Sequence, residues 1–244
     1  FFVPLYATIQ FSLQAKKGQL SLTAYQNVLQ SPEFFRSFSF SFQTAILTIL
    51  VSALLIVPTS YWVNLRLPRM RPVIEFLTLL PIVVPAVVLV FALIRTYNRT
   101  ALTDSRNGTY ALLIGAYVML SFPYMYRAVD TGLRSINARV LTEAAQSLGA
   151  GWVTVLFRVI FPNVYIALLS GAFITFAIVM GEFTIASLLS QPAFGPYMNL
   201  LSSSKVYEPS ALAIISFALT WAAIGALELV GRRLPGRARI VGTR

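Results

Sequence analysis

The stretch from Ser37 to Leu65 contains no charged residue, and it constrains the fold more than any other feature of the chain. A helix needs about 20 apolar residues to cross the hydrocarbon core of a bilayer, and this stretch is long enough. Of the whole sequence, 57% is hydrophobic and only 11% is charged, whereas soluble domains carry about 25% charged residues. The chain is therefore predicted to be an integral membrane protein. Pro58 is expected to kink this span near its end.

Five further apolar segments complete the predicted architecture. The first is short, and we expect it to be the outer part of a span whose beginning is absent from this sequence. Together with Ser37–Leu65, the five segments predict one all-α membrane domain of six transmembrane helices over residues 1–244. The five segments are Phe1–Leu13, Ile74–Ile94, Tyr110–Tyr126, Val164–Phe183 and Ala211–Val230.

The basic residues between the spans predict the orientation in the membrane. Alternate connections form two sets, and the set richer in Lys and Arg is expected in the cytoplasm. Both termini then lie inside, as in a multi-pass protein of a bacterial-type cytoplasmic membrane. The richer set is Arg66, Arg69, Arg71, Arg127, Arg134, Arg139, Arg158, Arg232, Arg233, Arg237, Arg239 and Arg244, and the poorer set is Lys16, Lys17, Arg36, Arg95, Arg99, Arg106 and Lys205.

The composition excludes several kinds of chemistry. The sequence contains no Cys and no His, which removes thiol nucleophiles, imidazole bases and the usual zinc sites. It has no Walker A pattern, so we do not expect it to bind ATP by that route. No catalytic residue, metal site or bound cofactor is expected. The net charge of +11 is explained by Arg at the membrane edges, and no nucleic-acid partner is expected.

A polar, glycine-punctuated segment separates the fourth and fifth spans. Asn137 is a candidate N-cap for a short helix that runs to Leu148, and Gly149 suits the left-handed residue that ends such a helix. Arg139 and Glu143 form an i,i+4 pair on its exposed face. The segment is therefore predicted to begin with one short, capped helix.

A second helical run is expected to follow, over Trp152–Ile160, before Pro162 opens the fifth span. Asp130 lies where the polar segment begins. A pair of short helices at a membrane surface presents side chains and charges to something soluble, so the segment predicts a contact with a soluble partner.

The same segment resembles the signature loop of the inner-membrane permease subunits of binding-protein-dependent ABC importers. The family pattern is Glu-Ala-Ala, three residues, Gly, nine residues, and then Ile, any residue, Leu and Pro. Val159 replaces the Ile and Phe161 replaces the Leu, and both replacements are apolar. The signature loop, together with the helix ends that flank it, is predicted over about residues 129–163. The residues that match in register are Glu143, Ala144, Ala145, Gly149 and Pro162.

This resemblance implies a permease of the type I ABC importer fold that takes up essentially the whole chain. It implies that the helix containing Glu143 docks into a cytoplasmic ATPase subunit, and that the matching residues form the coupling surface. ATP and Mg would bind to that partner, so this chain would be a transport subunit and not an enzyme. A second permease chain, identical or related, and an extracytoplasmic solute-binding protein are the other implied partners.

Two prolines and one acid are candidate pathway residues. Pro81 and Pro85 free backbone carbonyls at membrane depth, where irregular backbone is tolerated only against protein or water. They either flank a pathway or only kink a packed helix. Glu182 has no basic neighbour in the sequence, and an acid in a span is a functional candidate. It would serve as part of a polar outer gate or a weak cation site, unless it only reaches the hydrated interface.

Two further predictions concern packing. Ala167, Gly171 and Thr175 recur at four-residue spacing on the fifth span, and small residues at this spacing favour a close helix–helix interface. Glu75 lies just inside the basic turn that contains Arg69 and Arg71, and we expect it either to extend toward the interface or to pair there.

The substrate class rests on one further resemblance. The stretch MGEFTIASLL, residues 180–189, looks similar to permeases of the polyamine, ferric-iron and thiamine group, which implies a small polar or cationic solute such as a polyamine. The alternative is an ATP-independent channel or secondary transporter, for which the paired intramembrane charges of ion coupling are sparse. An intramembrane enzyme would need a close pair of intramembrane acids, which the sequence lacks.

Overall fold

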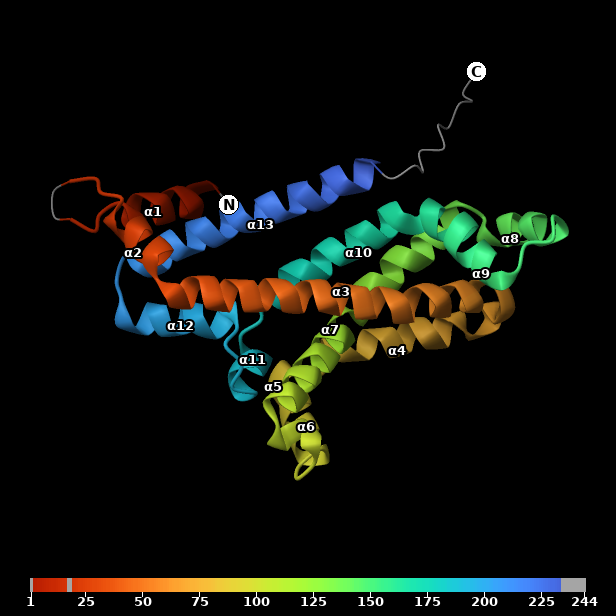
Figure 1. The fold of residues 1–244 in the computed structure, drawn as a ribbon, viewed down its shortest axis with the longest axis horizontal. Coiled ribbons are helices and arrows are strands. Elements are labelled where there is room, and N and C mark those ends of the chain that lie inside the picture. Colours follow the sequence, from red (N-terminus) through yellow and green to blue (C-terminus); the bar gives the residue numbers. More distant parts are fainter. Residues whose placement is uncertain (1, 17–18, 234–244) are drawn as a thin grey trace, which may run out of the picture.

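The computed structural model describes residues 2–16 and 19–233. Every secondary-structure element assigned in these ranges is a helix. Three long helices form the body of the molecule, namely α3 Pro32–Arg66, α7 Arg106–Ser135 and α10 Phe161–Gly181. A fourth, α13 Glu208–Arg233, runs along one side of this body (Figure 1). The all-α membrane fold expected from the sequence is confirmed.

Four helices are long and apolar enough to cross a membrane, and one bent pair of helices raises the number to five among the residues that the structure describes. The first apolar segment forms α1 Phe2–Ser12, whose 11 residues are too few to span a bilayer alone. The expected count of six spans stays a prediction. Phe1, Lys17 and the tail from residue 234 onward lie outside the described residues.

The third apolar segment, for which a span over Ile74–Ile94 was expected, is not one continuous helix. It forms α4 Arg71–Val83 and α5 Ala86–Thr96, and these helices are bent by 96° relative to each other. Val84 has an extended backbone (φ −81°, ψ 118°), because the ring of Pro85 disfavours helical geometry in the residue before it. The segment therefore makes a broken span or a re-entrant loop.

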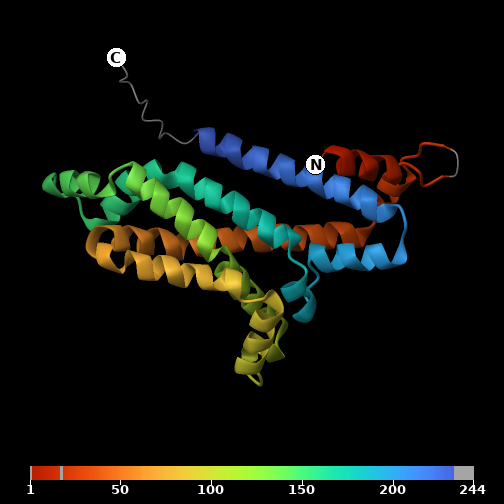
Figure 2. The same ribbon diagram turned by 180° about the vertical axis from the view of Figure 1, so that it is seen from behind.

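An arm projects from the side of the body beyond this break. It consists of α5, the short α6 Ala101–Asp104 and the beginning of α7 (Figures 1 and 2). Pro81 lies inside α4, one turn before the break, and Pro85 lies directly before α5. The two prolines thus flank the point where the chain leaves the body.

Helix α7 packs against both α3 and α10. A Cβ added to Gly171 on α10 would lie 3.0 Å from Met125 Sδ and 3.2 Å from Ala128 Cβ on α7. A Cβ on Gly132 of α7 would lie 2.6 Å from Ala167 Cβ. The small residues therefore let the two backbones approach closely, and the predicted interface is confirmed for Ala167 and Gly171.

Two hydrophobic clusters form the core, one toward each end of the long helices. The largest buried side chains include Tyr117, Phe34 and Phe176 in one cluster and Met125 and Leu133 in the other. Two buried polar side chains of this interior, Ser52 and Ser121, form a hydrogen bond with each other at 2.7 Å. Pairing satisfies their hydrogen bonds where no water is available.

The connections lie at opposite ends of the body (Figures 1 and 2). One end holds α1 and the short helices α2 Thr23–Gln30 and α12 Phe194–Ser204, and the other holds the turn after α3 and the signature loop. The arm leaves from the side, and the short α11 Thr184–Leu188 lies there in contact with α5 (Figure 1). Which end faces the cytoplasm stays a prediction. The short helices at the second end are η1 Pro68–Met70, α8 Ala138–Ser147 and α9 Trp152–Thr154.

Candidate functional site

The signature loop begins with α8, which follows α7 after a tight turn. Asn137 occupies the predicted N-cap position, but its backbone is left-handed (φ 48°, ψ 60°) and its side chain makes no capping hydrogen bond. Asn tolerates this conformation better than most residues do. Asn137 therefore supplies the turn out of α7 and not the expected side-chain cap.

Gly149 ends α8 as predicted, with φ +82°. Its N–H donates to the Gln146 carbonyl at 2.9 Å, and the Ala150 N–H donates to the Ala145 carbonyl at 3.0 Å. This pair of bonds is a Schellman motif. A Cβ at Gly149 would meet no atom within 4 Å. The position therefore requires glycine for its backbone conformation and not for lack of space.

One face of α8 is tied to α3. Ala138 and Thr142 are buried on this face. The Thr142 hydroxyl donates to the Ala138 carbonyl at 2.6 Å, so its bond of 2.8 Å to the Tyr61 hydroxyl has Tyr61 as the donor. A side-chain hydrogen bond thus joins the loop to the membrane body.

The other face of α8 carries most of the expected coupling residues. Glu143 and Ala144 are exposed and Ala145 is half-buried. Glu143 accepts a hydrogen bond from Arg139 at 2.9 Å, which confirms that pair. Leu148, at the tip, is 89% exposed, and α8 protrudes beyond the body at this end (Figure 1). An exposed leucine on a protruding helix is a candidate contact surface.

The helix after the turn is continuous, which corrects the expected separate run Trp152–Ile160. Helix α9, the π-helical η2 Val155–Ile160 and α10 follow one another without a break. Pro162 lies in the first turn of α10. It has no N–H to donate, and the wider π-helical turns just before it accommodate this defect. Pro162 therefore lies inside a long helix and does not open it.

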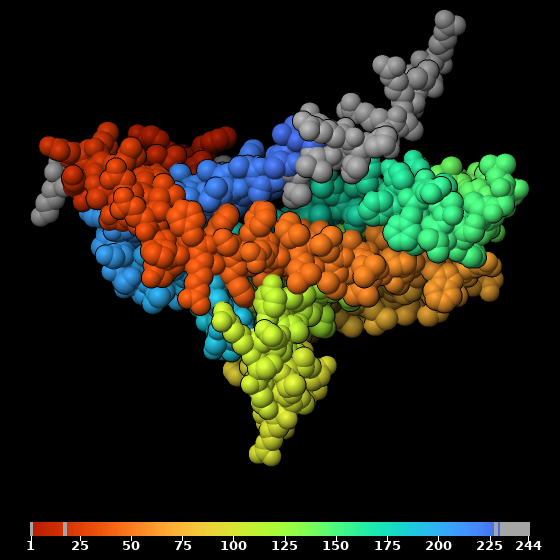
Figure 3. Space-filling model, viewed as in Figure 1, coloured from red at the N-terminus to blue at the C-terminus, as the bar shows by residue number. Residues whose placement is uncertain are grey.

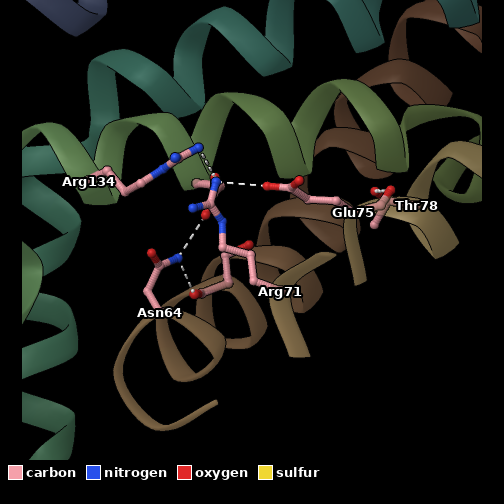
Figure 4. Close-up of polar contacts among 7 residues, drawn as sticks. Asn64, Arg71, Glu75, Thr78 and Arg134 are labelled. Atoms are coloured by element: carbon pink, nitrogen blue, oxygen red, sulfur yellow. Dashed lines mark hydrogen bonds and ion pairs between the residues drawn. The ribbon is translucent and has the colours of Figure 1, made fainter. Parts of the chain in front are cut away.

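A buried ion-pair cluster joins α7 to α4 beside the signature loop (Figure 4). The side chain of Asp130 is only 3% exposed, and one carboxylate oxygen accepts hydrogen bonds from Arg71 at 2.8 Å and Arg134 at 2.7 Å. The other oxygen accepts one from Asn64 Nδ2 at 2.9 Å. Arg71 also pairs with Glu75 at 2.7 Å, which is one of the two arrangements that the sequence left open. Two guanidinium groups thus balance two carboxylates.

Sequence reasoning missed the contacts of Asp130 in this cluster. Asp130 and Arg134 have i,i+4 spacing, as Arg71 and Glu75 do, and these two local pairs were the signals available. Asn64 belongs to α3 and Arg71 to α4, so their contacts with Asp130 arise only in the tertiary structure. The cluster fixes the beginning of α4 against α3 and α7.

Glu182 lies at the opposite end, just after α10. Its carboxylate accepts hydrogen bonds from the Ile185 N–H at 2.8 Å and the Ala186 N–H at 3.1 Å, which caps the short α11. The Tyr117 hydroxyl donates to the same carboxylate at 3.0 Å. Glu182 therefore connects α10, α11 and α7, and its role in a gate or pathway stays a prediction.

The candidate residues thus occupy separate parts of the molecule. Glu143, Ala144, Ala145 and Gly149 lie together on or directly after α8. Pro162 follows in the next helix, whereas the remaining three residues are remote from it: Glu182 at the opposite end, and Pro81 and Pro85 at the break between α4 and α5.

Apolar helices of this length, with a capped helix that protrudes at one end, define an α-helical integral membrane protein. Residues 68–234 match the family described as "Binding-protein-dependent transport system inner membrane component", and the chain belongs to this family. It is a permease subunit of an ABC importer. This membership decides against the alternative of an ATP-independent channel or secondary transporter.

Several curated proteins are similar to the chain. It is 29% identical over 130 residues to the spermidine/putrescine transport system permease protein PotC of Haemophilus influenzae, which covers 52% of this chain and 50% of PotC. It is 30% identical to a probable molybdenum ABC transporter permease protein of Haloferax volcanii, over 76% of this chain and 70% of that protein. It is 24% identical to the sulfate transport system permease protein CysT of Synechocystis, over 81% and 71%. The chain thus spans about half the length of PotC and more of the other two.

Two solved structures share the fold. One is a bacterial ABC transporter involved in the import of the acidic polysaccharide alginate, with a TM-score of 0.65 and 21% identity over 95% of this chain and 91% of that chain. The other is an amino acid ABC transporter with histidines, with a TM-score of 0.59 and 18% identity over 86% and 97%. At these identities the likeness establishes the fold alone.

Proposed function

We propose that this chain forms one half of a gated solute pathway and is coupled to a cytoplasmic ATPase subunit through α8. The observation that carries this role is apolar exposure on α8, where Leu148 is 89% and Val140 is 55% exposed. Helix α8 is not among the helices that can span a membrane, so the bilayer core does not cover these side chains. Burial against a partner protein would remove them from water.

Helix α8 is suited to transmit movement because it is fixed at its middle and at its C-terminal end. The Tyr61–Thr142 bond ties it to α3, and the Schellman motif at Gly149 ties it to the turn that leads into α9. Trp152 in α9 packs edge-on against Tyr61, with ring centroids 6.4 Å apart. A displacement of α8 would therefore move α3 and the α9–α10 helix together. ATP and Mg belong to the partner in this proposal.

The substitution Leu148→Asp tests the coupling surface. A leucine that is buried on binding contributes about 1.5–3 kcal/mol, so its replacement should weaken the association with the ATPase at least tenfold. Leu20→Asp is the matched control, since Leu20 is 77% exposed and lies at the other end of the molecule. A Leu148→Asp permease that binds its ATPase as tightly as the control does would contradict the proposal.

The side of the body that carries the break between α4 and α5 is uncovered. No residue of α4 is buried, and Val90 is the only buried residue of α5. Val83, beside the break, is 77% exposed. Irregular backbone at membrane depth requires protein or a water-filled cavity beside it. A second permease chain would cover this side, and Pro81 and Pro85 would flank the pathway between the two chains.

Cysteine cross-linking tests this arrangement without interference, because the chain has no Cys. In the assembled importer, Val83→Cys should cross-link to a second permease chain. A product of twice the chain's mass indicates an identical partner, and a mixed product indicates a related one. Leu200→Cys on α12, 66% exposed at the far end, should give no such product. Failure of Val83→Cys to cross-link to any permease chain would reject the arrangement.

The ends of the body have different proposed partners. The end with α8 faces the cytoplasm in this proposal, in agreement with its larger number of basic residues. The connections Gln14–Arg36 and Gln191–Pro209 lie in the loops assigned to the outer side. A solute-binding protein outside the membrane would deliver the substrate against them.

The proposed substrate is a small charged solute, which keeps a polyamine as one candidate. The relatives named above are described for spermidine/putrescine, molybdenum and sulfate, so their substrates differ in charge. The Glu182 carboxylate already accepts three hydrogen bonds, which favours a gate over a cation site. The proposed substrate class is tested by measuring uptake of labelled putrescine, sulfate and molybdate by the assembled importer. If none of the three is taken up, the proposal of a small charged substrate is rejected.

A further inference from the structure

An apolar groove runs along the surface between α3 and the α9–α10 helix. One part encloses about 470 Å³ and includes Ala53, Leu54 and Pro58 of α3 opposite Leu168 of α10. A second part, of about 410 Å³, lies at the end of α3. Leu156 and Phe157 line both parts, so the two form one continuous groove.

The groove has the length of one membrane leaflet. Its first part extends along α3 from Ile46 to Pro58, which at about 1.5 Å per residue is roughly 18 Å. Half of the hydrocarbon core of a bilayer is about 15 Å thick. Small side chains open the groove in the wall of the body, since Ala53 and Ala172 line it beside the proline. Its shape therefore matches one extended acyl chain.

The end of the groove next to the signature loop contains a charged side chain and two tryptophans, which the first part lacks. Its lining includes a single charged side chain, Arg66, and the two tryptophans Trp62 and Trp152, which are 63% and 48% exposed. The guanidinium carbon of Arg66 lies 5.5 Å from the centroid of the Trp152 ring. Tryptophan is enriched at the level of the lipid headgroups. This end thus lies where a headgroup would be.

The charge of Arg66 is not balanced within the part of the chain that the structure describes. Arg66 forms no salt bridge with any residue in the ranges 2–16 and 19–233, and no acid lines either part of the groove. The contact with Trp152 holds the guanidinium beside the groove, because a cation is attracted to the face of the indole ring. A negatively charged group at this point would complete the site.

We propose that this groove binds one anionic phospholipid, with an acyl chain along α3 and α10 and the headgroup at Arg66. In Figure 3, α3 runs along this face of the molecule with the helix that follows the signature loop beside its far end. Trp152 begins that helix directly after the loop. The lipid therefore contacts the same turn that carries the movement of α8 into the membrane.

Tryptophan fluorescence tests the proposal in the full chain reconstituted into phosphatidylcholine bilayers. The chain has three tryptophans, so Trp62→Phe with Trp221→Phe leaves Trp152 alone. A minor fraction of lipid with a brominated acyl chain is added, either as phosphatidylglycerol or as phosphatidylcholine. Brominated phosphatidylglycerol should quench Trp152 more strongly. Since one basic residue is worth about 1 kcal/mol toward anionic lipid, the preference should be about fivefold.

Three further variants decide the outcome. Arg66→Gln should abolish the preference, and Ala53→Phe, which fills the groove, should reduce quenching by both lipids. Arg69→Gln is the control, because Arg69 is exposed nearby but lines neither part of the groove. Equal quenching of Trp152 by the two lipids, or a preference that Arg66→Gln leaves unchanged, would overturn the proposal. Absence of quenching by either lipid would show that protein fills the groove, which overturns it as well.

Discussion

Asp130 on α7 and Arg71 at the start of α4 form a salt bridge of 2.8 Å, although 59 positions separate them in the sequence. The carboxylate is almost fully buried, and Arg134 and Asn64 share it. The turn after α3 is thereby held against the base of α7, in the same region as the signature loop.

The substitution Asp130→Asn should destabilise the chain. It keeps an oxygen in place but leaves Arg134 without a balancing charge and leaves Arg71 with Glu75 alone. Breaking a buried ion pair costs about 3–5 kcal/mol, and we expect a loss near 3 kcal/mol because Arg71 and Arg134 are 24% and 51% exposed. Denaturant unfolding of the purified protein measures this loss.

The control for Asp130→Asn is Arg139→Gln, which breaks the pair with Glu143, where the side chains are 71% and 63% exposed. Exposed pairs contribute about 0–1 kcal/mol, so this variant should unfold close to the wild type. Equal stability of the two variants would mean that the buried cluster does not hold α4 in place.

The substitution Gly149→Thr should impair coupling while the body stays folded. A residue with a Cβ in this left-handed conformation costs about 1–2 kcal/mol, and no neighbouring atom is close enough to clash. We expect reduced association with the ATPase and severalfold lower transport. Co-purification and uptake assays measure these effects.

Gly151→Thr is the matched control for Gly149→Thr. Gly151 has open space around it as well, but its backbone is extended (φ −74°, ψ 164°), and threonine is acceptable at the start of a helix. It should keep coupling near the wild-type level. If both variants behave alike, the left-handed conformation is not what the signature loop requires.

The contact between Glu182 and Tyr117 predicts an effect on gating. Tyr117→Phe removes the bond of 3.0 Å to α7 and leaves the cap on α11 intact. Hydrogen bonds to charged groups contribute about 1.5–3 kcal/mol, so loss of this one should raise ATP hydrolysis without substrate about tenfold if it holds the gate closed. Glu182→Gln should act in the same direction. Wild-type transport and wild-type basal hydrolysis in both variants would leave Glu182 as a helix cap only.

The orientation of the chain can be read with single cysteines. Ser135 is exposed at the end of α7 next to the signature loop, and Ser203 is exposed on α12 at the opposite end. In intact cells, a membrane-impermeant maleimide should label Ser203→Cys and should leave Ser135→Cys unlabelled until the membrane is opened. The reverse result would invert the topology.

Local patterns were sufficient for much of this protein. An uncharged stretch such as Ser37–Leu65 has few stable states outside a bilayer, so the membrane class follows from composition. The spacing from Glu143 to Gly149 identified both the family and the end of α8, because a left-handed helix end needs glycine at one fixed position. The i,i+4 pair of Arg139 and Glu143 was equally local.

Other features depended on contacts between distant residues, which no local pattern encodes. Two prolines in an apolar run are compatible with a kink or with a sharp break, and only the packing of α4 against α7 shows the 96° bend. The sequence presented Asp130 as the first residue of a loop, whereas the fold buries it between α3 and α4. A buried carboxylate without partners would cost free energy of folding, and Arg71 and Asn64 offset this cost by pairing with Asp130. Sequence therefore determined the membrane class and the signature loop, and tertiary structure decided how the helices break and where their charges pair.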